Sequence, residues 1–106
     1  MALEITETNF KQEVLESPIP VLIDSWATWC MPCQILATVV DELAQEYAGK
    51  LKVGKINVDK DGELAAKYSV MSIPALLFFK NGQIVDTVVG AVPKGFLIDR
   101  IKKVIQ

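Results

Sequence analysis

Histidine is absent from the 106-residue sequence, and cysteine occurs only twice. A structural zinc site takes about four Cys or His ligands, so this chain would need an unusual set of carboxylates to complete one. Catalytic triads that use histidine as the base are excluded as well. The reactive chemistry that remains is what two thiols can perform by themselves.

Long apolar runs and long basic runs are also missing. The apolar stretches are short and are interrupted by Asp24 or by turn residues, so no segment is predicted to span a bilayer. Residues 1–7 lack the positively charged and continuous apolar regions of a signal peptide, and we therefore expect a cytoplasmic protein. Acidic and basic residues are mixed, with a formal net charge of −2, so we expect neither a nucleic-acid partner nor a membrane partner.

The composition is that of a folded protein. Hydrophobic residues make up 51% of the chain and charged residues 23%, which argues against disorder. The length is enough for one hydrophobic core and too short for a second. We therefore expect a single domain over residues 1–106, acting as a monomer.

The apolar spacing predicts both helices and strands. Helices are expected over residues 8–15, 33–48, 62–68 and 94–105, with Thr8 as the candidate N-cap of the first. Strands are expected over residues 20–27, 51–58, 75–80 and 83–89, the last two joined by an Asn81-Gly82 hairpin turn. This order predicts an α/β fold, with a central mixed sheet flanked by helices on both faces.

The two cysteines lie together at the predicted start of the second helix. Cys30 falls where a strand ends and a helix begins, so free backbone N–H groups and the helix dipole favour a thiolate there. Cys33 lies about one turn further along and can resolve a mixed disulfide. We predict Cys30 as the nucleophile and Cys33 as the resolving thiol. The alternatives are two inert buried thiols or half of a zinc site, which the missing ligands disfavour.

Two of the charged residues within the predicted strands are candidates for the site. Asp24 interrupts an apolar strand, where a carboxylate is costly unless it is paired or its pKa is raised. It is a candidate proton shuttle, and the alternative is a structural carboxylate at a strand end. Lys55 shares strand parity with Leu51 and Val53, which makes it a candidate for tuning Asp24. Exposure at the strand end is the alternative for this lysine.

Residues 26–33, Trp-Ala-Thr-Trp-Cys-Met-Pro-Cys, resemble the Trp-Ala-x-Trp-Cys-Gly-Pro-Cys segment of the thioredoxin family. Further matches in order and spacing are Asp24, Lys55, Ile73-Pro74, Lys80-Asn81-Gly82 and Gly90. The resemblance covers essentially the whole chain. It implies the thioredoxin fold and the activity of a protein dithiol–disulfide oxidoreductase that reduces protein disulfides.

The resemblance also implies roles for individual residues. Asp24 would take the proton of the resolving thiol, and Pro74 would follow a cis peptide bond and lie against the disulfide, beside backbone that can pair with an extended substrate. Trp26 is expected in the core, whereas Trp29 is either a core aromatic or part of the substrate-binding surface. We call that predicted surface the docking surface; it comprises Trp29, Met31, Pro32, Met71, Ile73, Pro74, Val89, Gly90 and Ala91.

The family resemblance implies partners but no cofactor bound to this chain. Disulfide-containing proteins would be the substrates, and a thioredoxin reductase would return the dithiol, with electrons from NADPH through a flavoprotein or from a ferredoxin-dependent or other flavin-dependent enzyme. Met31 replaces the usual glycine between the cysteines, which leaves the redox potential and the type of reductase open. Two other functions remain: a redox-inert binding module, and a thiol oxidase or isomerase of an oxidising compartment.

Overall fold

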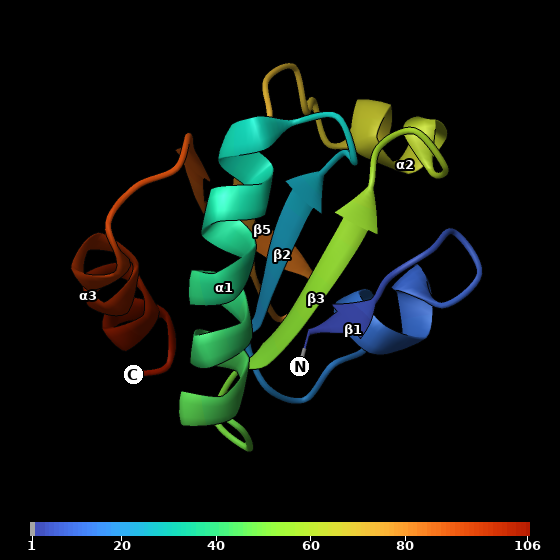
Figure 1. Cartoon of the computed structure of the whole chain (residues 1–106). Coiled ribbons are helices and arrows are strands. Elements are labelled where there is room, and N and C mark those ends of the chain that lie inside the picture. Colours follow the sequence, from blue (N-terminus) through green and yellow to red (C-terminus); the bar gives the residue numbers. More distant parts are fainter. Residues whose placement is uncertain (1) are drawn as a thin grey trace.

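A five-stranded mixed sheet forms the centre of the protein, whose computed structural model describes residues 2–106 (Figure 1). The strands are β1 (Leu3–Glu4), β2 (Val21–Trp26), β3 (Lys52–Asn57), β4 (Ala75–Lys80) and β5 (Gln83–Val89). The helices are η1 (Lys11–Leu15), α1 (Met31–Glu46), α2 (Gly62–Lys67) and α3 (Lys94–Val104). The strand order is β1-β3-β2-β4-β5. β3 is parallel to β1 and β2, whereas the pairs β2–β4 and β4–β5 are antiparallel.

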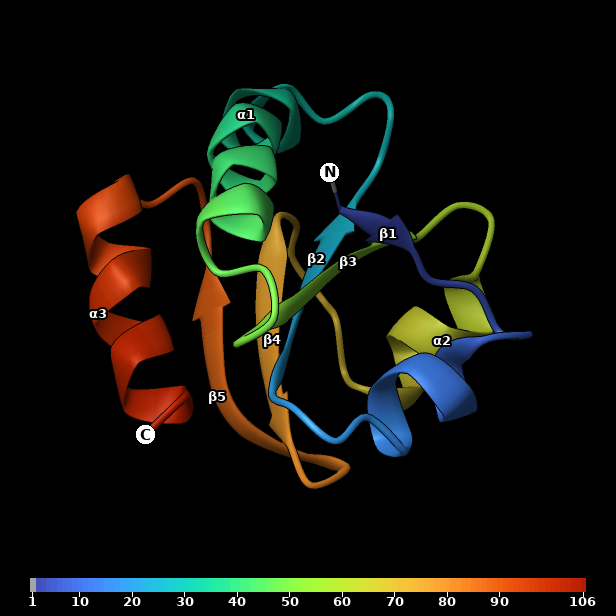
Figure 2. The same cartoon turned by 90° about the horizontal axis from the view of Figure 1, so that it is seen from below.

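Helices cover both faces of the sheet, as predicted. Helices α1 and α3 lie on one face, and η1 and α2 lie on the other (Figure 2). The alternation of side chains along β2 divides the interior accordingly. Leu22 packs into the core beneath α1 and α3, whereas Ile23 packs into the core beneath η1 and α2. Within residues 2–106, no helix is long and apolar enough to cross a membrane.

The hairpin and the later elements confirm the sequence pattern. Asn81 and Gly82 have positive φ angles of 55° and 78°, as a type I′ turn requires. The C-terminal helix α3 buries Leu97, Ile101 and Val104 in the core and adds partly exposed ion pairs. Lys94 contacts Glu42 and Glu46 of α1, at 3.1 and 2.6 Å, and Arg100 contacts Asp86 of β5 at 2.7 Å.

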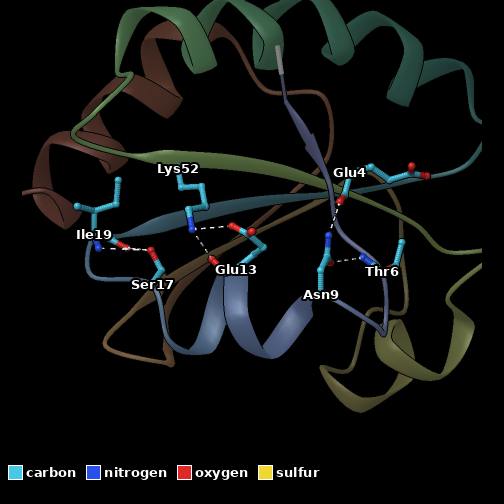
Figure 3. Close-up of polar contacts among 7 residues, drawn as sticks. All are labelled: Glu4, Thr6, Asn9, Glu13, Ser17, Ile19 and Lys52. Atoms are coloured by element: carbon cyan, nitrogen blue, oxygen red, sulfur yellow. Dashed lines mark hydrogen bonds and ion pairs between the residues drawn. The ribbon is translucent and has the colours of Figure 1, made fainter.

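The N-terminal segment differs from its prediction. Strand β1 was not expected, and η1 is a five-residue π-helix preceded by Phe10, so Thr8 is not its N-cap. The Asn9 side chain explains the difference, because it accepts a hydrogen bond from Thr6 N at 2.8 Å and donates one to Glu4 O at 2.9 Å (Figure 3). These local bonds compete with a regular first turn of helix.

Lys52 joins η1 to the sheet. Its ammonium group donates to the carbonyl oxygen and to Oε1 of Glu13, both at 2.9 Å, as Figure 3 shows. The lysine is therefore held by a backbone acceptor as well as by an ion pair. This contact places η1 over the apolar side chains of β2 and β3 on that face.

Gly54 lies in the middle of β3, where it pairs with Leu3 of β1 and Ile23 of β2. A Cβ atom there would lie 2.6 Å from Cγ1 of Ile5 and 3.2 Å from Cδ1 of Ile23. The packing of the Ile5 and Ile23 side chains over β3 therefore leaves no room for a side chain at this position.

We predict that Gly54→Ala lowers the free energy of unfolding by about 1–3 kcal/mol, the usual cost of overpacking a core. Gly62→Ala is the matched control, because a Cβ atom there meets nothing within 4 Å. Urea unfolding of both variants measures the difference. A Gly54→Ala protein as stable as the Gly62→Ala protein would contradict this account of the packing.

Candidate active site

The two cysteines lie at the start of α1, shortly after the end of β2. Cys30 is the N-cap residue of α1, with an extended backbone, and its sulfur accepts a hydrogen bond from the backbone N–H of Cys33 at 3.3 Å. Cys30 and Cys33 form a disulfide, with their Cα atoms 5.2 Å apart. The first N–H groups of a helix have no partner within the helix, and here one of them points at the Cys30 sulfur. The same N–H group would stabilise a thiolate at this position.

Apolar side chains surround the disulfide. Cys30 and Cys33 are 5% and 2% exposed, and together with Ala27 they form a small cluster against which Ile73 packs. The Ile73–Pro74 peptide bond is cis, as the family resemblance implied. The carbonyl oxygen of Pro74 accepts a hydrogen bond from Gly90 N at 2.9 Å, so the segment before β4 is joined to the end of β5.

The residues of the docking surface differ in their exposure. Trp29, Met31 and Met71 are 69%, 66% and 93% exposed, and Pro32, Val89 and Ala91 are also exposed. Ile73 and Gly90 are half-buried, and Pro74 is buried. Most of these side chains therefore present apolar atoms to solvent.

Trp29 is not a core aromatic. Its indole Nε1 donates a hydrogen bond to Oδ2 of Asp59 at 2.9 Å, while most of the ring stays exposed. Trp26, expected in the core, is half-buried and packs against the cysteine cluster. Asp59 follows the end of β3, and no local pattern in the sequence could have connected it with a tryptophan thirty residues earlier.

Ile35 borders this surface and was missed in the sequence interpretation. It is 65% exposed and lies four residues after Met31 in α1, so the two side chains share one side of the helix. The spacing of two apolar residues four apart, outside the buried stripe of Cys33, Leu36 and Val40, was the available signal.

Asp24 is completely buried in β2. Neither of its carboxylate oxygens has a hydrogen-bond partner in the described part of the chain. Its burial raises the pKa of the carboxyl from 3.8 to about 6, against the opposing field of the Lys55 ammonium and with a smaller contribution from Asp41. An acid with a pKa close to neutrality can accept and release a proton under ordinary conditions.

Lys55 is the partner of Asp24 in the register between β2 and β3. Its side chain is half-buried, and its ammonium group lies 4.9 Å from the centre of the Trp26 ring, in a cation–π contact. No ion pair joins it to Asp24 in the structure of residues 2–106. Lys55 therefore acts on Asp24 through its field and not through a direct contact.

The sequence is similar to known proteins over nearly its whole length, including the residues of this site. The family model described as "Thioredoxin" matches residues 1–103. The chain belongs to the thioredoxin family. It is 54% identical to "Thioredoxin 1" of Nostoc sp. over 102 residues, which cover 96% of this chain and 95% of the relative. It is 54% identical to "Thioredoxin 1" of Synechococcus elongatus over 103 residues, covering 97% and 96% of the two chains.

A chloroplast relative is similar over about half of its length. "Thioredoxin M-type, chloroplastic" of Spinacia oleracea is 48% identical over 100 residues, covering 94% of this chain and 55% of the relative. With its cysteine pair at the active-site position of the thioredoxin family, the chain is a protein dithiol–disulfide oxidoreductase. Members of this family act on disulfide substrates and are reduced in turn by a reductase.

Among residues 2–106, no three His, Cys, Asp or Glu side chains gather as a metal site would require.

The raised pKa of Asp24 predicts a pH-dependent stability. Because the folded protein holds this proton to a higher pH than the unfolded chain, stability falls as the pH rises from about 4 through about 6. Asp24→Asn removes the ionisation, so it should raise the free energy of unfolding at pH 8 by about 3 kcal/mol. Near pH 4 the two proteins should be equally stable. Urea unfolding at both pH values measures the difference, and a gain that is the same at both would contradict a charge effect.

Proposed function

We propose that the protein reduces disulfides of other proteins, with Cys30 as the attacking thiol and Cys33 as the resolving thiol. The Cys30 thiolate attacks one sulfur of the substrate disulfide, forms a mixed disulfide and expels the other sulfur as a thiolate. Cys33 then attacks the Cys30 sulfur, which closes the Cys30–Cys33 disulfide and releases the second substrate thiol. Two electrons pass to the substrate. The observation that carries the assignment is the position of Cys30 as the N-cap of α1, with its sulfur against an N–H group of the helix.

Asp24 is the proposed acceptor of the Cys33 proton. Its side chain points to the face of the sheet that Leu22 shares, beneath α1, and Cys33 is buried on the inner side of that helix. The raised pKa of Asp24, about 6, suits a base that works near neutral pH. Lys55 is the proposed tuning residue, because its field favours the ionised carboxylate and so opposes the effect of burial.

The docking surface is the proposed binding site for substrate polypeptides. Its nine residues carry no charge, and its exposed indole, thioether and aliphatic groups suit an extended apolar segment beside the substrate disulfide. Backbone groups next to Pro74 are the proposed partners for the backbone of that segment. A flat apolar surface accepts many sequences, because burial of apolar area requires no directional match.

Recharging requires a separate electron donor. The proposed donor is a thioredoxin reductase, either of the NADPH-dependent flavoprotein type or of a ferredoxin-dependent or other flavin-dependent type. In this scheme the protein is a single domain over residues 1–106, works as a monomer in the cytoplasm, and contributes to electron transport and redox homeostasis there.

Serine variants of the two cysteines test the order of attack. Cys30→Ser should abolish reduction of insulin disulfides, whereas Cys33→Ser should attack once and stay joined to its substrate through Cys30. Non-reducing electrophoresis and mass spectrometry identify that joined species. Substrates trapped on Cys33 of the Cys30→Ser protein would reverse the assignment. Failure of the reduced, unmodified protein to reduce insulin disulfides would overturn the proposed reductase activity and favour a redox-inert scaffold.

A kinetic experiment tests Asp24 separately. Asp24→Asn should slow the closing attack of Cys33 on the mixed disulfide by about tenfold to a hundredfold at pH 7, at or below the usual contribution of a general base. The rise of that rate with pH near 6 in the unmodified protein should be absent in the variant. Stopped-flow measurement of thiol release from a preformed mixed disulfide gives both quantities. An unchanged pH profile would remove Asp24 from the proposed mechanism.

A further inference from the structure

A pocket of about 260 Å³ lies beside the docking surface, between the connection from α2 to β4 and the last two strands. It is lined by residues of that connection and of β4 and β5, among them Tyr68, Met71, Ala75, Leu77, Thr87 and Val89. We call it the lateral pocket. Sequence patterns gave no sign of it, because the connection has no regular structure of its own.

The lateral pocket is continuous with the docking surface. Met71 and Val89 line the pocket and are also two of the exposed residues of that surface. Val89 pairs with Ala75, directly after the Ile73–Pro74 segment that packs against the cysteine cluster. A polypeptide lying on the docking surface therefore reaches the pocket with a neighbouring residue.

The chemistry of the lining defines the occupant. None of the lining residues is charged, and the buried side chains of Ala75 and Leu77 supply apolar surface. A charged group placed there would lose hydration without gaining a partner. The volume also lies below the roughly 300–1,000 Å³ of sites that enclose a whole small molecule. The pocket thus suits one uncharged, apolar side chain.

A second pocket, of about 360 Å³, has a different character. It lies between η1 and α2 and is lined by four charged residues, Glu7, Lys11, Glu63 and Lys67, together with apolar ones. None of its lining residues packs against the cysteine cluster. Nothing connects this pocket with the thiol chemistry.

We propose that the lateral pocket binds one aliphatic or aromatic side chain of the substrate polypeptide, a few residues from the cysteine that Cys30 attacks. The pocket is then a specificity site for the sequence around the substrate disulfide. This inference rests on the proposed function, because it assumes that substrates occupy the docking surface.

The variant Thr87→Phe tests the proposal by filling the pocket. Thr87 is exposed on β5, and phenylalanine suits a strand, so the fold should persist. Val85→Phe is the matched control, because Val85 is exposed on the same strand and does not line the pocket. Circular dichroism and urea unfolding verify that both variants are folded.

The substrates are short peptides with one cysteine, activated as a mixed disulfide with 2-nitro-5-thiobenzoate. One reference peptide has serine at the three positions on either side of the cysteine, and each test peptide has leucine at one of these positions. With the reduced, unmodified protein, leucine at one position should raise the second-order rate constant of chromophore release about tenfold over the reference, the lower end of what burial of a leucine contributes. Thr87→Phe should lose this preference and Val85→Phe should keep it, while the reference peptide reacts equally with all three proteins.

The outcomes separate the pocket from the proposed function. The lateral pocket is not a specificity site if no leucine position is preferred or if Thr87→Phe keeps the preference. The same conclusion follows if Thr87→Phe slows the reference peptide as much as it slows the leucine peptide. In each case the reductase activity stands. If the unmodified protein does not release the chromophore from any peptide, the proposed function itself fails.

Discussion

The central position of β2 is the constraint on which the rest of the site depends. This strand is hydrogen-bonded to β3 on one side and to β4 on the other, and residues 21–25 are all buried. Because both edges and both faces are occupied, the strand can neither shift its register nor turn a side chain to solvent. The point at which β2 ends is therefore fixed, and so is the position of Cys30 at the start of α1. The same burial removes water from Asp24 and raises its pKa.

Asp24 shows how the fold keeps a group that is unfavourable for stability. Its two oxygens have no hydrogen-bond partner in the described part of the chain, and the nearest cation in register, Lys55, lies over the Trp26 ring. An apolar residue at this position would remove the cost of desolvation. In the proposed function this carboxyl, with its pKa raised to about 6, accepts the proton of Cys33. Structural stability and the proposed proton transfer thus impose opposite requirements on one residue.

The sequence predicted the elements that follow strong local patterns. The buried strand β2, the amphipathic helix α1 and the Asn81-Gly82 hairpin were each recognisable, because hydrophobic periodicity and turn chemistry act within a few residues. The disulfide pair was predicted for the same reason, since its two members lie in one turn of helix.

What could not be predicted depends on contacts between distant segments or on weak local signals. Strand β1 has only two residues, too few to show alternation, and its place is set by pairing with β3, a strand distant in the sequence. The η1 helix departs from its expected start because Asn9 bonds to Glu4 and Thr6 instead of allowing an earlier turn. The link from Trp29 to Asp59 and the lateral pocket join residues separated by long stretches of chain. The roles of the individual site residues remain predictions.

The docking surface has a consequence for the way in which partners meet the protein. None of its nine residues is charged, and the neighbouring Asp59 is bonded to Trp29. In the proposed function, the nine residues add no charge of their own to the contact, so any long-range steering of a partner comes from charges elsewhere on the protein. In that scheme, the fit of apolar side chains after contact determines how long each partner stays bound.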